Sequence, residues 1–320
     1  MKNETTVIAF SKDRPLQMHA YLESLIKYAD IEPRDIFVIY KETESIKYSE
    51  VISMFDGVNW IKEESFFNQV REIVNNAKEF IMFGCDDVVF TREFSLDHAT
   101  SVLADESVFG YTARMGTNIH LFPEKYEKKN GDIYWNWRIS KLDYCNYPWE
   151  LDCTVYRKQD VIELISTEGI NISNPNYLES EIAKQAEELV HRDYLVCSDA
   201  EGKAICITVN RVQDTHLNEY DHKCYFDVID LYNMYKEGTR LDIERVAKKK
   251  TDKIHVGAEF LLLKGNRSIS AKLSILDRML LLLKNIHYLT TVNLRKSYME
   301  QEKEILTKVR EDIDKKHMYK

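Results

Sequence analysis

Short apolar runs alternate with helical patterns through the first ninety residues, and this alternation restricts the fold more than any other feature of the sequence. The apolar runs predict strands at residues 7–10, 36–40, 58–61 and 80–83. Helical spacing of apolar residues predicts helices over residues 16–26 and 66–77. Parallel sheets with crossover helices produce this alternation. We therefore predict an open α/β sheet.

Composition and charge exclude several classes of protein. The chain has 320 residues, 44% apolar and 30% charged, which is typical of a soluble globular protein. The formal charge of −9 argues against a nucleic-acid partner. The N-terminus lacks the features of a secretion signal, and six cysteines without a CxxC pair indicate reduced thiols, so we expect a cytoplasmic protein.

Two predicted strands end in polar loops. Residues 11–14 (SKDR) follow the first strand, and residues 84–87 (GCDD) follow the fourth. Ligands of open α/β sheets bind beyond the carboxyl ends of the strands, so these loops form the candidate site. Adjacent carboxylates at Asp86 and Asp87 suit Mn²⁺ or Mg²⁺ bound together with a nucleotide diphosphate. The alternative is that both aspartates cap a turn.

Several segments resemble GT-A fold glycosyltransferases, especially a family-2-like bacterial group that builds surface glycans. They are residues 6–25, 68–90, 114–118, 150–157, 174–179 and 209–213. The resemblance covers residues 5–235 and implies a Rossmann-like sheet that binds a nucleotide sugar. We place this domain at residues 1–268 and a helical C-terminal tail at residues 269–320.

The resemblance also implies roles for individual residues. Asp86 would hold the nucleotide ribose and Asp87 the metal, although Cys85 stands where many relatives have a third acidic residue. His216 would be a further metal or phosphate ligand. The expected donor-binding residues are Ser11, Asp13, Arg14, Lys41, Asp86, Arg114, Asn118 and Arg211.

An inverting hexosyl transfer needs a general base for the acceptor hydroxyl. Asp152 is the first candidate, and Glu150 and Glu179 are the alternatives; each could instead be a surface or cap carboxylate. A retaining enzyme would not need this base. Aromatic rings that stack on an acceptor sugar are expected at Trp135, Trp137, Tyr147 and Trp149, with core packing as the alternative.

The predicted tail is basic and strongly apolar. Between residues 272 and 296, five basic residues stand against one acid, which gives this segment a charge of +4. Such a helix fits peripheral contact of residues 271–296 with the anionic inner face of a membrane, where lipid-linked acceptors reside. Packing against the catalytic domain or a second subunit of a homo-oligomer is the alternative.

These observations predict a metal-dependent glycosyltransferase. It would move a sugar from a nucleotide-diphosphate donor to a hydroxyl of a polysaccharide or lipid-linked oligosaccharide. A P-loop enzyme is excluded because Gly202-Lys203 is followed by Ala204 and lacks the required earlier glycine. A sugar nucleotidyltransferase is disfavoured because residues 11–15 contain no glycine. A catalytically silent carbohydrate- or nucleotide-sugar-binding assembly protein remains as the alternative.

Overall fold

A computed structural model describes residues 4–142, 144–167, 170, 172–210, 212 and 226–265. The predicted tail at residues 269–320, and the predicted boundary at residue 268, lie outside the described residues. None of the helices in the described part combines the length and apolarity that crossing a membrane requires.

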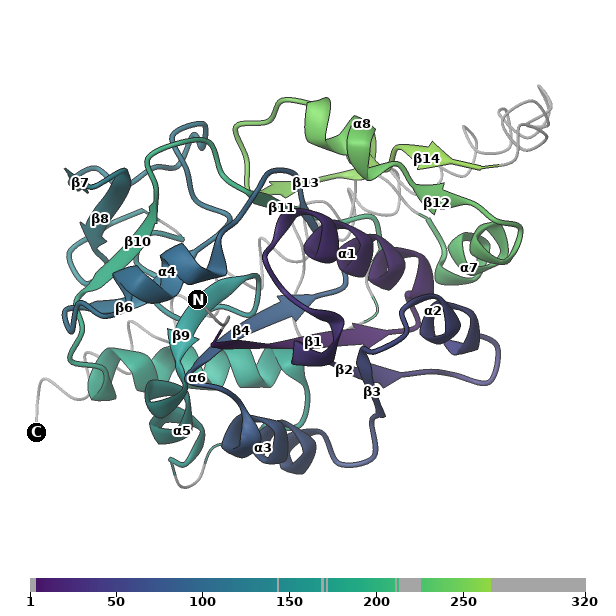
Figure 1. Ribbon diagram of the computed structural model, residues 1–320, viewed down its shortest axis with the longest axis horizontal. Coiled ribbons are helices and arrows are strands. Elements are labelled where there is room, and N and C mark those ends of the chain that lie inside the picture. Colours follow the sequence, from purple (N-terminus) through teal and green to yellow (C-terminus); the bar gives the residue numbers. More distant parts are fainter. Residues whose placement is uncertain are drawn as a thin grey trace, which may run out of the picture.

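A nine-stranded sheet forms the centre of the molecule (Figure 1). Its spatial order is β3-β2-β1-β4-β9-β6-β10-β8-β7. The strands are β1 (Thr5–Lys12), β2 (Ile36–Lys41), β3 (Asn59–Lys62), β4 (Phe80–Cys85), β6 (Val108–Thr112), β7 (Glu127–Lys129), β8 (Asp132–Asn136), β9 (Thr154–Arg157) and β10 (Tyr194–Ser198).

The direction of the strands divides this sheet at β9. Strands β3, β2, β1 and β4 are parallel, and β9 runs antiparallel to both β4 and β6. Strand β6 therefore runs in the direction of β4, and β10 is parallel to β6. At the far edge, β8 and β7 form antiparallel pairs. The predicted parallel-rich α/β sheet is confirmed.

Helices cover both faces of the sheet, as Figure 1 shows. The helices are α1 (Pro15–Tyr28), α2 (Ser49–Met54), α3 (Phe66–Asn76), α4 (Leu96–Val102), α5 (Lys158–Ile165), α6 (Pro175–Leu189), α7 (Val228–Lys236) and α8 (Ile243–Lys248). One face carries α1, α2, α4, α7 and α8, and the other carries α3, α5 and α6.

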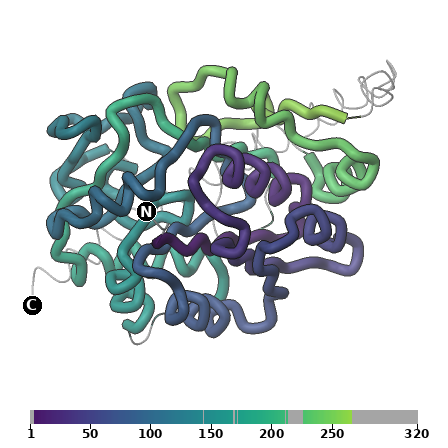
Figure 2. The backbone as a smooth tube through the Cα atoms, in the orientation of Figure 1, coloured from purple at the N-terminus to yellow at the C-terminus, as the bar shows by residue number. Residues whose placement is uncertain are grey.

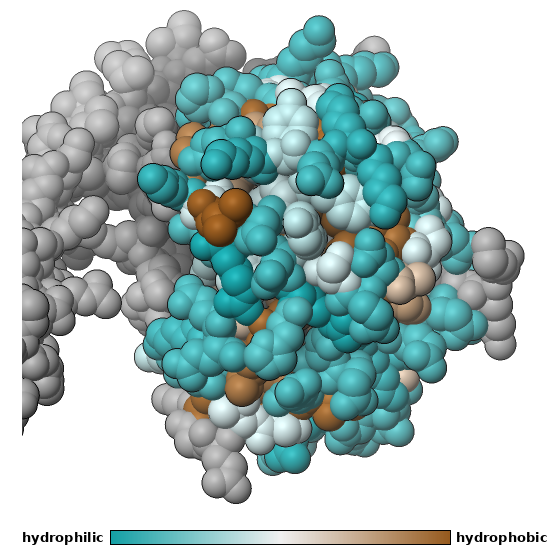
Figure 3. All heavy atoms as spheres, turned by 90° about the vertical axis from the view of Figure 1, so that its left-hand side faces the viewer, coloured by the Kyte–Doolittle hydropathy of each residue, from teal (hydrophilic) through white to brown (hydrophobic). Residues whose placement is uncertain are grey.

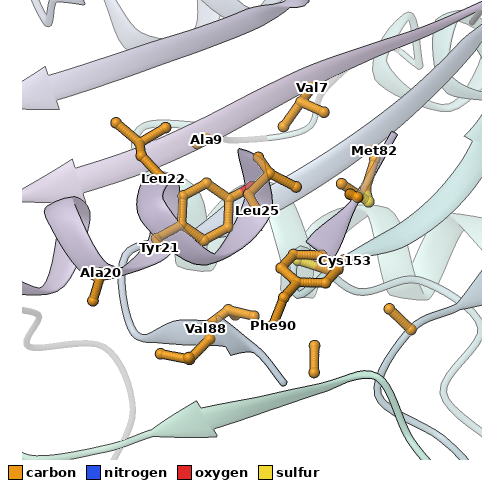
Figure 4. Packing of buried hydrophobic residues seen from close by; sticks show 14 of the residues in the cluster. Val7, Ala9, Ala20, Tyr21, Leu22, Leu25, Met82, Val88, Phe90 and Cys153 are labelled. Carbon is orange, nitrogen blue, oxygen red and sulfur yellow. The ribbon is translucent and has the colours of Figure 1, made fainter. Parts of the chain in front are cut away.

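Alternating side chains of β1 supply two separate cores. Successive residues of a strand point to opposite faces, so Val7 and Ala9 enter the core beneath α1 while Ile8 and Phe10 enter the core beneath α3. Figure 4 shows the first core, where Tyr21, Leu22 and Leu25 of α1 pack near Val7 and Met82. Because both faces of the sheet are buried, β1, β2 and β4 consist mainly of apolar residues.

Two small sheets attach the later part of the chain. One has the order β13-β11-β5, and the other pairs β12 with β14. Their bounds are β5 (Val88–Phe90), β11 (Ala204–Ile207), β12 (Arg240–Leu241), β13 (His255–Val256) and β14 (Leu263–Lys264), and two 3-10 turns span Pro33–Asp35 and Ala258–Phe260. Figure 2 shows the green segment from α7 onward lying beside α1, and α7, β12 and α8 all contact that helix.

The view in Figure 3 shows a largely hydrophilic face with scattered apolar patches. The sequence predicted four strands and two helices in the first ninety residues, and all six are present. The structure adds α2, β5 and the 3-10 turn at Pro33–Asp35 in that region. In the middle third it defines β6 to β10, where the sequence predicts irregular segments and short strands, with helices over residues 158–165 and 178–190.

Candidate active site

Polar side chains from four chain segments meet at one edge of the central sheet. The carboxyl ends of β1, β4 and β6 lie at this edge, together with the amino end of the oppositely directed β9. A backbone hydrogen bond of 2.9 Å from Cys153 N to Phe83 O joins β4 to the turn before β9. Cys153 adopts a φ of 72°, a left-handed conformation that non-glycine residues rarely take.

A cleft of about 520 Å³ opens at this edge. The structure brings the loops after β1 and β4 together here, as predicted. The predicted site residues in its walls are Ser11, Arg14, Lys41, Asp86, Asp87, Arg114, Tyr147, Asp152 and Glu179.

Asp86 is held by two side chains of the first loop. Ser11 Oγ donates to Asp86 Oδ2 at 2.7 Å, and Arg14 Nη1 donates to Asp86 Oδ1 at 2.9 Å. Tyr48 supports both partners, because its hydroxyl is 2.5 Å from Ser11 Oγ and accepts a 3.0 Å hydrogen bond from Arg14 N. Burial raises the pKa of Asp86, and Arg14 opposes that rise.

The negative charge of Asp87 is less well neutralised than that of Asp86. The nearest oxygen of its carboxylate is 3.7 Å from Arg14 Nη1, and its side chain is 21% exposed. Burial raises the pKa of Asp87 to about 7; Arg14 opposes the rise, and the negative charges of Asp152 and Asp86 add to it. A positive charge entering the cleft would therefore stabilise this carboxylate.

Arg114 sits between two of the predicted catalytic acids. Its Nη1 donates to Asp152 Oδ2 at 2.9 Å, and its Nη2 forms an ion pair with Glu150. Glu150 also accepts from Thr154 Oγ1 and, at 3.3 Å, from Thr112 Oγ1. Burial alone would raise the pKa of Asp152, but Arg114 and then His255 hold it below its usual value.

His255 and Cys206 also belong to this cluster, and the sequence did not indicate either. Arg114 Nη1 is 3.1 Å from His255 Nε2 and 3.3 Å from Cys206 Sγ. Burial lowers the pKa of His255 to about 4, and Arg114 adds to that effect. Pairing of β11 with β13 places both residues beside the cleft, and no local sequence pattern marks that pairing.

Glu179 reaches the cleft from the second turn of α6. That helix begins after Asn174, whose side chain accepts a 3.1 Å hydrogen bond from Tyr177 N and so caps the first turn. Burial raises the pKa of Glu179 to about 8, and the charge of Asp152 adds to the rise while Arg114 opposes it.

Three predicted donor-binding residues have identifiable structural roles. Asp13 Oδ1 accepts a 2.8 Å hydrogen bond from Thr43 N, which ties the first loop to the segment after β2. Lys41 lines the cleft and pairs with Glu63 at 2.7 Å. Asn118 does not line the cleft: it bonds Gly202 N and Thr251 O beside a smaller cavity of about 90 Å³.

The structure corrects the prediction for the aromatic residues. Trp135, Trp137 and Trp149 are at most 2% exposed and belong to the core beneath α3, so they are core residues rather than acceptor contacts. A ring covered on both faces by protein cannot stack on a sugar. Tyr147 remains in the cleft wall, and the sequence missed Tyr144 beside it. Predicted residues Arg211 and His216 lie outside the described residues.

A divalent cation fits the carboxylates at the end of β4. Hard cations prefer oxygen ligands, and Asp87 offers a carboxylate that the protein neutralises only in part. A second group, formed by Asp152, Cys206 and His255, has its ligand atoms within 4.8 Å of one another. Arg114 Nη1 already lies within hydrogen-bonding distance of all three, so a guanidinium occupies that centre.

The chain is similar in sequence to a known glycosyltransferase. The chain is 29% identical over 307 residues to the bifunctional glycosyltransferase pgtA of Dictyostelium discoideum. The predicted resemblance to glycosyltransferases is confirmed. The match covers 81% of this chain and 39% of the relative, so the chain spans well under half of that relative's length. No protein-family model matches this chain.

Two solved structures show limited similarity of fold to this chain. S. aureus TarS 1–349 in complex with UDP has a TM-score of 0.43 and 12% identity, over 64% of this chain and 61% of that one. The mannosyltransferase PcManGT from Pyrobaculum calidifontis, in complex with GDP-Man and Mn²⁺, has a TM-score of 0.35 and 12% identity, over 60% and 53%.

Proposed function

We propose that this chain is a metal-dependent glycosyltransferase that uses a nucleotide-diphosphate sugar. The observation that carries the proposal is the incompletely neutralised Asp87 beside the firmly held Asp86, at the carboxyl end of β4 and in the wall of a cleft. The name of the relative pgtA supports the reaction class. UDP-GlcNAc and GDP-Man, which are present in the TarS and PcManGT structures, are two sugar nucleotides to be tested.

The donor would bind along the ends of β1, β2 and β4. Asp86, fixed by Ser11 and Arg14, would accept hydrogen bonds from the ribose, and Lys41 would contact the same nucleotide. Asp87 would hold Mn²⁺ or Mg²⁺, which neutralises the diphosphate as it leaves. Arg211 and His216 remain proposed phosphate and metal contacts.

The acceptor would enter beside Tyr144 and Tyr147, which are 39% and 37% exposed and line the cleft. Apolar faces of sugars pack well on such rings. Asp152 and Glu179 are the acids in this part of the cleft, and Arg114 fixes Asp152 in place. The reaction would proceed with inversion, and its acceptor would be a polysaccharide or lipid-linked oligosaccharide at the inner face of a membrane.

The decisive experiment measures release of nucleoside diphosphate from a panel of sugar nucleotides that includes UDP-GlcNAc and GDP-Man. We expect release by the wild-type chain with Mn²⁺ and little release with EDTA. Asp87→Asn should lower the rate by about 10²- to 10³-fold, because the diphosphate loses its electrostatic support. The control Glu93→Gln alters an exposed acid away from the cleft and should leave the rate unchanged.

Unchanged turnover by Asp87→Asn would contradict the metal role. Binding of a sugar nucleotide without release of diphosphate by the wild-type chain would support the catalytically silent alternative.

A further inference from the structure

We propose that Glu179, rather than Asp152, takes the proton from the attacking hydroxyl. This inference rests on the proposed glycosyltransferase function and identifies one residue within that site.

Asp152 is bound to other side chains through one of its carboxylate oxygens, Oδ2. It accepts a 2.9 Å hydrogen bond from Arg114, its Oδ2 is 3.5 Å from Cys206 Sγ, and His255 lies close to it in the same cluster. Adding a proton to Asp152 would remove a negative charge that compensates Arg114, which is costly because Arg114 is only 4% exposed. Asp152 therefore acts as a positioning residue for Arg114 and His255.

The other carboxylates are engaged as well. Glu150 is bound by Arg114 and two threonine hydroxyls, and it does not line the cleft. Asp86 is bound by Ser11 and Arg14. Asp87 is the residue best placed to hold a cation, so its oxygen lone pairs would bind the metal and would not be available to take a proton.

Glu179 differs from all of these. It lines the cleft, yet within the part of the chain that the structure describes its carboxylate makes no hydrogen bond and no ion pair. Its position is nevertheless fixed, because the adjacent Leu178 is fully buried in the core beneath α3. An acid held rigidly in a cleft without a protein partner is available to a substrate hydroxyl.

The electrostatic surroundings favour proton uptake at this carboxylate. Asp152 repels the negative charge of Glu179, while Arg114 attracts it. Protonation of Glu179 relieves the repulsion by Asp152 and leaves the pair between Arg114 and Asp152 intact. The hydroxyl of Tyr147 also lies within electrostatic range of Glu179, at the side where an acceptor sugar would stack.

The acceptor O–H bond breaks and its proton passes to the Glu179 carboxylate. The oxygen lone pair forms the new bond to the anomeric carbon. The bond from that carbon to the diphosphate breaks, and its electron pair leaves on the nucleoside diphosphate.

The test compares two nucleophiles, water and sodium azide, using whichever sugar nucleotide the wild-type chain cleaves. Azide carries no proton, so its attack does not need a base. Glu179→Ala should lower diphosphate release with water by about 10²- to 10⁴-fold. Azide should restore release in this variant and yield a glycosyl azide, whereas the affinity for the donor should change less than about threefold. Glu179→Gln should show the same loss with water.

Asp152→Ala and Glu188→Ala are the two comparison variants. Asp152→Ala should lose activity with both nucleophiles, because it disturbs Arg114 rather than removing a base. Glu188 is an exposed acid on the same helix, so its replacement should change neither rate. Azide rescue of Asp152→Ala but not of Glu179→Ala would overturn the proposal, and so would normal hydrolysis by Glu179→Ala. Absence of diphosphate release by the wild-type chain would instead overturn the proposed function, and the inference with it.

Discussion

The cleft contains more carboxylates than the neighbouring arginines can neutralise. Arg14 pairs with Asp86, and the single positive charge of Arg114 is shared between Glu150 and Asp152. The surplus negative charge falls on the side chains with the weakest pairing, Asp87 and Glu179, and theirs are the carboxyl groups whose pKa values rise to about 7 and about 8. The protein thus keeps two acids in a state that is unfavourable without a ligand, as functional sites often do.

This surplus predicts a specific dependence of stability on pH. Because the pKa of Glu179 is raised in the folded state, the folded chain binds more protons than the unfolded chain between about pH 4.5 and pH 8. Stability should therefore fall as pH rises through that window. Glu179→Gln, which resembles the protonated acid, should match wild type near pH 4.5 and be more stable by at least about 1 kcal/mol at pH 8.5. Thermal unfolding with EDTA across this range measures the difference, and a constant difference would contradict it.

Individual site residues were predictable where the signal was local. Asp86, Asp87 and Arg14 follow strands that the sequence identifies clearly, and the structure brings them into one cleft. His255 was missed because it depends on a two-residue strand that pairs with β11, a contact between distant segments. The prediction that Trp135, Trp137 and Trp149 contact an acceptor was wrong. A cluster of aromatic residues has the same sequence pattern whether its side chains fill a core or face a ligand.

At the scale of elements, α6 connects the fold to the proposed chemistry. Its first turn is fixed by the cap at Asn174, and its second turn carries Glu179 into the cleft. The sequence placed this helix at residues 178–190, whereas the structure begins it at Pro175 because the Asn-Pro pair supplies both a cap and a favourable first residue. The segment at residues 158–165 was predicted with its observed bounds, since its apolar residues recur with helical spacing.

The cap predicts a split between stability and activity. Asn174→Ala should cost about 1 kcal/mol of unfolding free energy. It should also lower diphosphate release, because the turn before Glu179 loses its anchor. Ser95→Ala removes the cap of α4, where Ser95 accepts a 3.1 Å hydrogen bond from His98 N; neither Ser95 nor any residue of α4 lines the cleft. This control should lose similar stability in urea unfolding and keep its activity. Equal activity losses in both variants would show that α6 has no special role.

At the scale of the whole molecule, the segment from α7 to β14 is attached to the first helix. His19 of α1 packs against the rings of Phe55 and Tyr235, and its Nδ1 is 3.2 Å from the Tyr235 hydroxyl. Burial lowers the pKa of His19 to about 4, with Arg240 and then Lys264 adding to the effect. Glu23 is the acid that faces it, at 3.8 Å.

This attachment should weaken in acid. The folded-state pKa of His19 lies below its ordinary value of 6.5. The contribution of neutral His19 to the free energy of unfolding is therefore complete above pH 6.5 and is lost as pH falls toward 4. His19→Gln should remove on the order of 2 kcal/mol of the acid dependence of unfolding between these values. His120→Gln, at an exposed position, is the matched control and should follow wild type. Identical acid profiles for all three chains would contradict the prediction.

The proposed tail at residues 269–320 is expected to bring the whole molecule to a membrane surface. We expect deletion of residues 269–320 to leave diphosphate release intact and to abolish sedimentation with anionic vesicles. Neutral vesicles serve as the control, because a basic helix gains its attraction from anionic lipid. Unchanged sedimentation after deletion would exclude the membrane role, and loss of cooperative unfolding would indicate that the tail packs on the domain.

The position of β9 has a consequence for synthesis on the ribosome. Strands β1 to β4 come from the first 85 residues and can pair as soon as they emerge, but β4 gains its second neighbour only when residue 154 follows, about seventy residues later. During that interval β4 is an unprotected apolar border, the kind of surface on which nascent chains associate wrongly. Strand β9 therefore covers the border that the strands within residues 5–85 leave open.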